Sequence, residues 1–310
     1  MSTLNAQVHA LAQQHAAMGL PSNTDPQATA LNDSPAALAH AAARRLGFIE
    51  ADAQCIASAW ARQSLRTGRF DPGLWPSEPA DFGLAPPGIH PAAFPACPSA
   101  LGVYAVLPDA AWVRRMALAG VPTVQLRFKS PDPAAIRTEV AAAVLAVQGT
   151  DSLLFINDHW REAIEAGAYG VHLGQEDLDA LPPEALHTLR GSGLRLGVST
   201  HGYAEMLRAA AVRPSYLALG AVFPTTLKAM ATPPQGLGRL GAYARLMRDH
   251  PLVAIGGIGM EHLPAVAATG VGSFAVVRAI TGASDPEGTA QALMAAWRDA
   301  SSKKSGPLEY

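Results

Sequence analysis

The stretch FINDHWREAIEAGAYGVHLGQED, residues 155–177, contains two short apolar runs separated by a helix-like segment. The first run ends at Asp158, and the second is followed at once by Glu176 and Asp177. Apolar runs without polar alternation are typical of strands covered on both faces, as in parallel sheets that lie between helices. The stretch therefore predicts two consecutive buried strands of a parallel α/β fold, each with acidic side chains just past its end.

The same alternation of apolar run and helix-like segment extends over residues 101–300. The strand-like runs are LGVYAVLP (101–108), TVQLRFK (123–129), SLLFIND (152–158), GVHLGQ (170–175), LRLGVST (194–200), SYLALG (215–220), LVAIGG (252–257) and SFAVVRAI (273–280). Eight strand and helix pairs in roughly 200 residues indicate an α/β protein with a (β/α)₈ TIM barrel near the lower end of its usual length. A doubly wound open sheet is the alternative, but the strand count and the missing GxGxxG motif after the first strand argue against it.

Residues 1–100 are expected to form an N-terminal extension, and residues 301–310 a C-terminal tail. Two helices are predicted, over 34–47 with Ser34 as N-cap and over 50–68, where Gly68 ends the second one. Residues 70–98 hold eight of the 25 prolines, which indicates a linker or an extended wrapping arm. Residues 1–30 lack clear periodicity and are expected to be disordered.

Composition excludes several classes of partner. The chain has 310 residues and a net charge of -2, which is not the basic footprint of a nucleic-acid-binding protein. No apolar run approaches the roughly 18 residues of a membrane span, and the N-terminus lacks the pattern of a signal peptide. We therefore expect a cytoplasmic protein that acts on small molecules, with neither a nucleic acid nor a membrane as partner. A homo-oligomer remains open.

The active site of such a barrel lies at the C-terminal ends of the strands and in the loops that follow them. Gln125, Arg127 and Lys129 at the second strand share one face, because side chains alternate along a strand. The candidates after the third to sixth strands are Asn157, Asp158, Asp177, Ser199, Thr225, Thr226 and Lys228. These positions are polar at one mouth of the barrel, which predicts a binding site there.

The carboxylates Asp158 and Asp177 come from neighbouring strands and suit Mg²⁺, which prefers oxygen ligands. Arg127, Lys129 and Lys228 supply positive charge around the same mouth. A metal held by carboxylates beside three cations favours a diphosphate ligand over a neutral sugar. The alternative for either carboxylate alone is N-capping of the helix that follows it.

A second anion site is indicated by AIGGIG, residues 254–259, and by VVRAI after the eighth strand. Gly256, Gly257 and Arg278 are the candidate residues. The loops after strands seven and eight commonly bind phosphate in this fold, although a glycine pair also serves tight turns. Two anion sites in one mouth imply two phosphorylated substrates or one long substrate.

Several ordered motifs together resemble the thiamine-phosphate synthase family over about residues 101–297. They are VQLRFK (124–129), FINDHWREAIEAGAYGVHLGQEDL (155–178), LGVSTHGYAE (196–205), YLALGAVFPTTLK (216–228), VAIGGI (253–258) and FAVVRAI (274–280). The resemblance implies a (β/α)₈ barrel transferase that joins hydroxymethylpyrimidine diphosphate to hydroxyethylthiazole phosphate with Mg²⁺, releasing pyrophosphate. A thiazole tautomerase of the same superfamily and a non-catalytic protein that binds thiamine precursors are the alternatives.

The resemblance also implies roles for individual residues. Gln125, Arg127, Lys129 and Asn157 would line the pyrimidine diphosphate pocket, with Mg²⁺ on Asp158 and Asp177. Lys129, Lys228 and Ser199 would act on the diphosphate as catalytic residues, and Thr225 with Gly257 would bind the thiazole phosphate. The chain departs from the family pattern at Leu227, where a threonine is usual, and at Arg278, where a serine is usual.

The extension carries a fainter resemblance. LGFIEADAQCIASAWARQSLRTG (46–68), followed by WPSEPADF (75–82), resembles the C-terminal helix and tail of hydroxymethylpyrimidine phosphate kinase. The glycine-rich catalytic segment of that kinase is absent, so we expect no kinase activity. An alanine-rich arm that packs on the barrel or on a partner is the alternative to a fusion remnant.

Overall fold

The computed structural model describes residues 3–20, 24–86, 90–225 and 232–302. Eight parallel strands close into a barrel in chain order, so the predicted (β/α)₈ TIM barrel is confirmed. The strands are β1 (Gly102–Leu107), β2 (Thr123–Leu126), β3 (Leu153–Asn157), β4 (Gly170–Leu173), β5 (Arg195–Thr200), β6 (Tyr216–Leu219), β7 (Leu252–Ile255) and β8 (Ser273–Val276).

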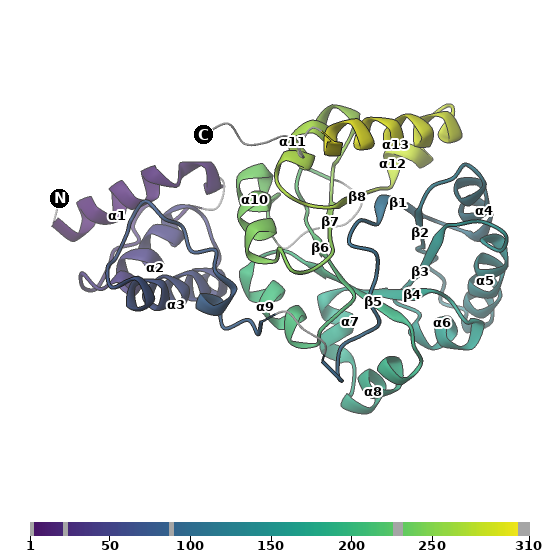
Figure 1. Ribbon diagram of the computed structural model, residues 1–310, viewed down its shortest axis with the longest axis horizontal. Helices are drawn as coiled ribbons and strands as arrows, with labels where there is room; N and C mark the ends of the chain where they lie inside the picture. Colours follow the sequence, from purple (N-terminus) through teal and green to yellow (C-terminus); the bar gives the residue numbers. More distant parts are fainter. Residues whose placement is uncertain (1–2, 21–23, 87–89, 226–231, 303–310) are drawn as a thin grey trace.

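Helices surround the barrel (Figure 1). They are α4 (Ala110–Leu118), α5 (Pro133–Ala146), α6 (Trp160–Ala166), α7 (Gln175–Ala180), α8 (Pro183–Gly191), α9 (Tyr203–Ala211), α10 (Gly236–Leu246), η4 (Met260–His262), α11 (Leu263–Ala268), α12 (Arg278–Thr281) and α13 (Pro286–Ser302). β4 is followed by two helices, and α13 packs on β1 and α4, which closes the ring of helices.

Side chains of each strand alternate between the barrel interior and the surrounding helices. Tyr104, Phe155 and Tyr216 fill the interior, and the rings of Phe155 and Tyr216 meet edge to face at 5.2 Å. Gly197 makes room for Tyr216, because a Cβ at this glycine would lie 2.1 Å from the tyrosine ring. Both faces of every strand are thus buried, which explains why the strands appear in the sequence as continuous apolar runs.

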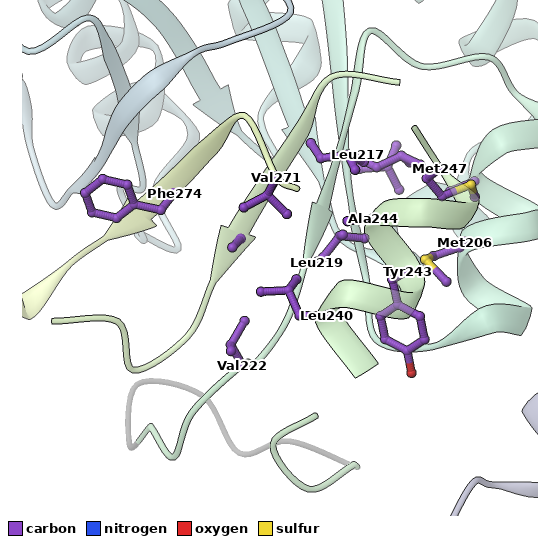
Figure 2. Packing of buried hydrophobic residues seen from close by; sticks show 14 of the residues in the cluster. Met206, Leu217, Leu219, Val222, Leu240, Tyr243, Ala244, Met247, Val271 and Phe274 are labelled. Atoms are coloured by element: carbon purple, nitrogen blue, oxygen red, sulfur yellow. The ribbon is translucent and has the colours of Figure 1, made fainter. Parts of the chain in front are cut away.

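The outward face of β6 packs on α10. Leu217 and Leu219 face Leu240, Ala244 and Met247 of the helix, and all five side chains are buried (Figure 2). The first turn of α10 consequently lies at the end of β6 where the barrel mouth opens. The position of this turn affects the site described below.

The described residues of the N-terminal extension form three α-helices, α1 (Thr3–Gln14), α2 (Pro35–Arg45) and α3 (Glu50–Thr67). Both predicted helices are present: the Ser34 hydroxyl accepts from the amide of Ala37 at 3.3 Å, and Gly68 ends α3 in the left-handed conformation. The expected disorder of residues 1–30 is wrong over Thr3–Gln14. Val8 and Leu11 of α1 are buried in the same apolar cluster as α2, so tertiary packing supplies the stability that periodicity alone does not indicate.

The extension packs against the barrel, beside α9 and α10 (Figure 1). The indole of Trp75 donates to the hydroxyl of Tyr203 at 2.9 Å, and Phe82 stacks on the same tyrosine. Farther along the proline-rich stretch, the amide of Phe94 donates to the carbonyl of Arg213 at the end of α9. The described part of this stretch is therefore a wrapping arm whose aromatic side chains join the core of the barrel.

In the part of the chain that the structure describes, no helix is both long enough and apolar enough to cross a bilayer.

Candidate active site

A cavity of about 820 Å³ opens at the C-terminal ends of the barrel strands. Every candidate residue from the sequence that the structure describes lines it: Gln125, Arg127, Lys129, Asn157, Asp158, Asp177, Ser199, Thr225, Gly256, Gly257 and Arg278. Thr226 and Lys228, together with Leu227, lie outside the described residues. The parallel barrel thus brings residues from seven strand ends into one cavity.

Asp158 and Asp177 approach one another at the mouth. Burial raises the pKa of the Asp158 carboxyl, the nearby Asp177 carboxylate raises it further, and Lys129 partly offsets both effects. Asp158 also has a φ of 64°, a conformation that few residues other than glycine adopt and that often accompanies a functional role. Asp158 is half-buried and Asp177 is exposed, so the two carboxylates meet at the mouth of the cavity beside Lys129.

The helix-capping alternative holds only in part. The backbone amide of Gly174, just before α7, donates to Asp177 Oδ2 at 3.3 Å, so Asp177 does satisfy a helix terminus. Asp158 is not the N-cap residue of the helix that follows it. The N-cap of α6 is His159, and no side chain forms a capping bond there. Capping therefore does not account for the carboxylate at Asp158.

The carboxylate pair suits a hard divalent cation. Burial is the largest cause of the raised pKa of Asp158, and the adjacent Asp177 carboxylate adds to it; a bound cation would offset both effects. Among the described residues, no group of three or more His, Cys, Asp or Glu side chains could enclose a metal. Mg²⁺ commonly takes only one or two carboxylates and completes its shell with water and substrate phosphate, so the residues present fit this ion.

Hydrogen bonds connect both sides of the cavity floor in one continuous chain. The Gln125 amide donates to Asn157 Oδ1 and accepts from the Tyr104 hydroxyl, each at 2.8 Å. The chain continues from Tyr104 to Tyr216 at 2.8 Å, and from Tyr216 to His172 Nδ1 at 2.7 Å.

His172 ends this chain at Ser199. Its Nε2 lies 2.8 Å from the Ser199 hydroxyl. Burial lowers the pKa of His172 to about 4, so the ring is neutral near pH 7 and carries one proton. Both ring nitrogens are hydrogen-bonded, so His172 is a buried histidine of the barrel interior whose polar groups are satisfied.

Tyr104 and Tyr216 were not among the sequence candidates, although both line the cavity. Each belongs to an apolar strand, Tyr104 inside β1 and Tyr216 as the first residue of β6, and a buried tyrosine hydroxyl needs a hydrogen-bond partner. The sequence could therefore have indicated that these two hydroxyls are hydrogen-bonded. It does not show which residues are their partners. His201 and Glu176 also line the cavity, and His201 Nδ1 lies 2.7 Å from Glu205 Oε2.

The glycine pair after β7 has its place fixed by the connection after β6. The amide of Phe223 donates to the carbonyl of Gly256 at 2.9 Å, and Gly257 has a φ of 65°. A Cβ on Gly257 would lie 2.5 Å from the carbonyl oxygen of Pro224. The glycines therefore serve a tight approach of two loops, and the same loops border the cavity.

A (β/α)₈ barrel with a carboxylate pair, basic side chains and a glycine turn around one cavity defines an enzyme that acts on phosphorylated small molecules. The chain belongs to the thiamine monophosphate synthase (TMP-TENI) family, whose model matches residues 104–280.

Individual relatives agree with the family. Thiamine-phosphate synthase from Neisseria meningitidis serogroup B is 53% identical over 204 residues, which are 66% of this chain and 98% of the relative. The synthase from Cronobacter sakazakii is 53% identical over 65% of this chain and 94% of the relative. The solved structure of thiamine phosphate pyrophosphorylase from Pyrococcus furiosus has a TM-score of 0.57 and 27% identity, over 64% of this chain and 96% of that one.

The family predicted from the sequence motifs is confirmed, and the chain is a transferase of thiamine biosynthesis. The synthase names of the curated relatives favour this activity over the tautomerase and binding-protein alternatives.

Proposed function

We propose that the protein joins hydroxymethylpyrimidine diphosphate to hydroxyethylthiazole phosphate in a dissociative substitution, giving thiamine phosphate and pyrophosphate. The observation that carries this proposal is the meeting of Asp158, Asp177 and Lys129 in one cavity with the loops after β7 and β8. Asp158, Asp177 and Lys129 suit a metal-bound diphosphate. The loops after β7 and β8 border space for a second phosphate.

The diphosphate would lie against Arg127 and Lys129 at the end of β2. Asp158 and Asp177 would hold Mg²⁺, which would neutralise charge on the leaving pyrophosphate. Arg127 and Lys129 stabilise the same developing charge, because they stand in the mouth before the reaction begins. Lys228 is expected to add a further cation from the connection after β6.

Bond changes in this reaction need no general base. The bond between the pyrimidine methylene carbon and the diphosphate oxygen breaks, and both electrons leave with pyrophosphate. The electron-poor methylene carbon then bonds to the thiazole nitrogen through the lone pair of that nitrogen. A neutral His172 with a pKa near 4 is consistent with this chemistry, since no proton has to be taken up.

The second substrate would place its phosphate at the loops after β6, β7 and β8. Thr225, Gly256, Gly257 and Arg278 line this part of the cavity, and Thr226, the further candidate for this phosphate, lies outside the described residues. Arg278 follows β8 at the start of α12, where a guanidinium suits a phosphate group. We propose that Arg278 contributes a charged contact in place of the serine usual in the family.

Formation of thiamine phosphate from both substrates and Mg²⁺, followed by mass spectrometry, tests the proposal. Arg127→Met should lower kcat/KM by about 10- to 100-fold, the range expected for a lost charged hydrogen bond. Arg161→Met is the matched control, because this exposed arginine stacks on Trp160 away from the cavity. If the wild-type protein makes no thiamine phosphate, the proposed reaction is wrong.

A further inference from the structure

The N-terminal extension reaches the barrel beside the mouth of the cavity. It packs on α9 and α10, which begin directly after the connections from β5 and β6 (Figure 1). Residues before 104 lie outside the family match, so this contact is additional to the barrel common to the family. The contact is also close: a Cβ on Gly238, in the first turn of α10, would lie 2.0 Å from the carbonyl oxygen of Ala17.

Arg239 in the first turn of α10 joins the two parts. Its side chain is only 2% exposed. The guanidinium donates to the carbonyl oxygens of Met18 at 2.9 Å and Leu46 at 3.0 Å, both in the extension, and lies 3.6 Å above the ring of Phe48. Burial of a charged group is costly unless its donors are satisfied, so these contacts hold the arginine in one place.

The same guanidinium reaches toward the cavity. Its third bond goes to Gln235 Oε1 at 3.0 Å. The backbone amide of Gln235 donates to the carbonyl of Ala221 at 2.8 Å, and the amide of Gly236 donates to that of Val222 at 2.9 Å. Arg239 therefore holds Gln235, and the backbone of Gln235 is bonded to Ala221 just after β6.

The end of β6 in turn holds the glycine pair. The amide of Val222 donates to the carbonyl of Ile255, and the amide of Phe223 donates to that of Gly256, each at 2.9 Å. A continuous series of bonds thus leads from Met18 and Leu46 of the extension to Gly256 at the cavity. No bond in this series involves a residue outside the described part of the chain.

A second contact of the extension reaches the same mouth after β5. α9 begins after Gly202, which has no side chain to cap the helix. Asp52 of the extension takes this place: its Oδ1 accepts from the amide of Ala204 at 2.9 Å. The extension therefore contacts the barrel at two neighbouring helix starts, both at the cavity end.

We propose that Arg239 is a positioning residue through which the N-terminal extension holds residues 221–223, just after β6, against the glycine pair after β7. The extension thereby sets the shape of the pocket for the second substrate's phosphate. This identification of the ligand rests on the proposed function, whereas the mechanical link does not.

The link is tested in the full chain by comparing Arg239→Met with Arg248→Met. Arg248 also binds the extension, at Ser77 and Glu78, but it lies past the opposite end of α10. Hydrogen exchange should rise by about tenfold or more at the amides of residues 221–223, Thr225 and residues 255–258 in Arg239→Met, in line with a lost charged hydrogen bond. Arg248→Met should leave these amides unchanged.

Equal exchange at these amides in both variants would overturn the proposal, whether or not the protein makes thiamine phosphate. Gln235→Met breaks the same series of bonds from the barrel side and should reproduce the effect if Arg239→Met does not fold. In the enzymatic assay, KM for the thiazole phosphate should rise by about tenfold in Arg239→Met, with kcat and KM for the pyrimidine diphosphate little changed. A fall in kcat alone would contradict a positioning role at this phosphate.

Discussion

The Ser199 hydroxyl lies 2.8 Å from Nε2 of His172, and the opposite nitrogen of that ring lies 2.7 Å from the Tyr216 hydroxyl. The donors and acceptors fix the direction of each hydrogen bond in the series from Gln125 to Ser199. The Tyr104 proton is donated to Gln125, so Tyr216 must donate to Tyr104 and accept from His172 Nδ1. His172 Nε2 then has no proton and accepts from Ser199. Donation by Ser199 to a diphosphate oxygen, the role implied by the family resemblance, would require this bond to break.

We predict that His172 is present as the single tautomer protonated at Nδ1. Nitrogen-15 NMR of the imidazole measures this directly, because protonated and unprotonated ring nitrogens have different chemical shifts. The signals should stay constant from pH 8 down to about pH 5, since the pKa is lowered to about 4. A ring protonated at Nε2, or one that titrates near pH 6.5, would contradict the assigned direction.

The same lowered pKa predicts a pH dependence of stability. The unfolded chain takes up a proton on His172 below a pKa of about 6.5, whereas the folded protein does so only below about 4. The contribution of a buried neutral His172 to the free energy of unfolding is therefore complete above pH 6.5 and is lost as the pH falls toward 4. It amounts to roughly 3 kcal/mol, from 1.36 kcal/mol per pKa unit. Urea unfolding of wild type and His172→Gln at pH 7 and pH 4.5 measures the difference, which should shrink at the lower pH.

Tyr216→Phe should remove two hydrogen bonds of the series that connects Gln125 with Ser199. His172 loses its acceptor and Tyr104 loses its donor, and both groups are buried. Each unsatisfied buried polar group costs about 1–3 kcal/mol, so two of them should lower the free energy of unfolding by about 2–6 kcal/mol. kcat/KM should also fall, because Ser199 and Asn157 at the two ends lose their fixed orientation. Tyr169→Phe, outside the cavity lining, serves as the control and should leave kcat/KM unchanged.

Gly257→Ala tests the close approach of the loops after β6 and β7. The new Cβ would meet the Pro224 carbonyl at 2.5 Å, and alanine disfavours the φ of 65°. KM for the thiazole phosphate should therefore rise. Gly149→Ala is a matched control, because Gly149 has a φ of 77° but nothing lies within 4 Å of an added Cβ. Equal KM values for the two variants would show that the approach of the loops does not shape the phosphate pocket.

Asp52→Asn should stabilise the protein at neutral pH. Burial raises the pKa of the Asp52 carboxyl to about 6, against about 3.8 in the unfolded chain. A raised pKa means that stability is fully present below pH 3.8 and is lost as the pH rises through 6, by about 3 kcal/mol at most. The asparagine oxygen can still accept from the amide of Ala204. The gain in melting temperature over wild type should thus grow between pH 4 and pH 7; a constant gain would contradict ionisation of a buried Asp52.

Much of the fold follows from local pattern, while the pairing of distant side chains does not. The apolar runs and the polar strand ends indicated the barrel and brought Asp158 and Asp177 to one mouth, because parallel strands end on the same side. The chain through Tyr104, Tyr216 and His172 depends on which interior side chains face each other across a closed barrel, and sequence periodicity carries no such information. Arginine side chains are usually exposed, so the sequence does not indicate that Arg239 is buried. It is buried because the extension covers α10.

The carboxylate pair of Asp158 and Asp177 is proposed to serve a metal-bound diphosphate. Pyrophosphate release, measured with both substrates over a range of Mg²⁺ concentrations, tests it in wild type, Asp158→Asn and Asp179→Asn. Asp179 is exposed, lies on α7 next to the site and pairs with Arg208. We predict release by the wild type that requires both substrates, a fall of about 100-fold or more in Asp158→Asn with a higher Mg²⁺ requirement, and no change in Asp179→Asn. Wild-type rates and an unaltered Mg²⁺ requirement in Asp158→Asn would contradict a role of Asp158 in holding the metal.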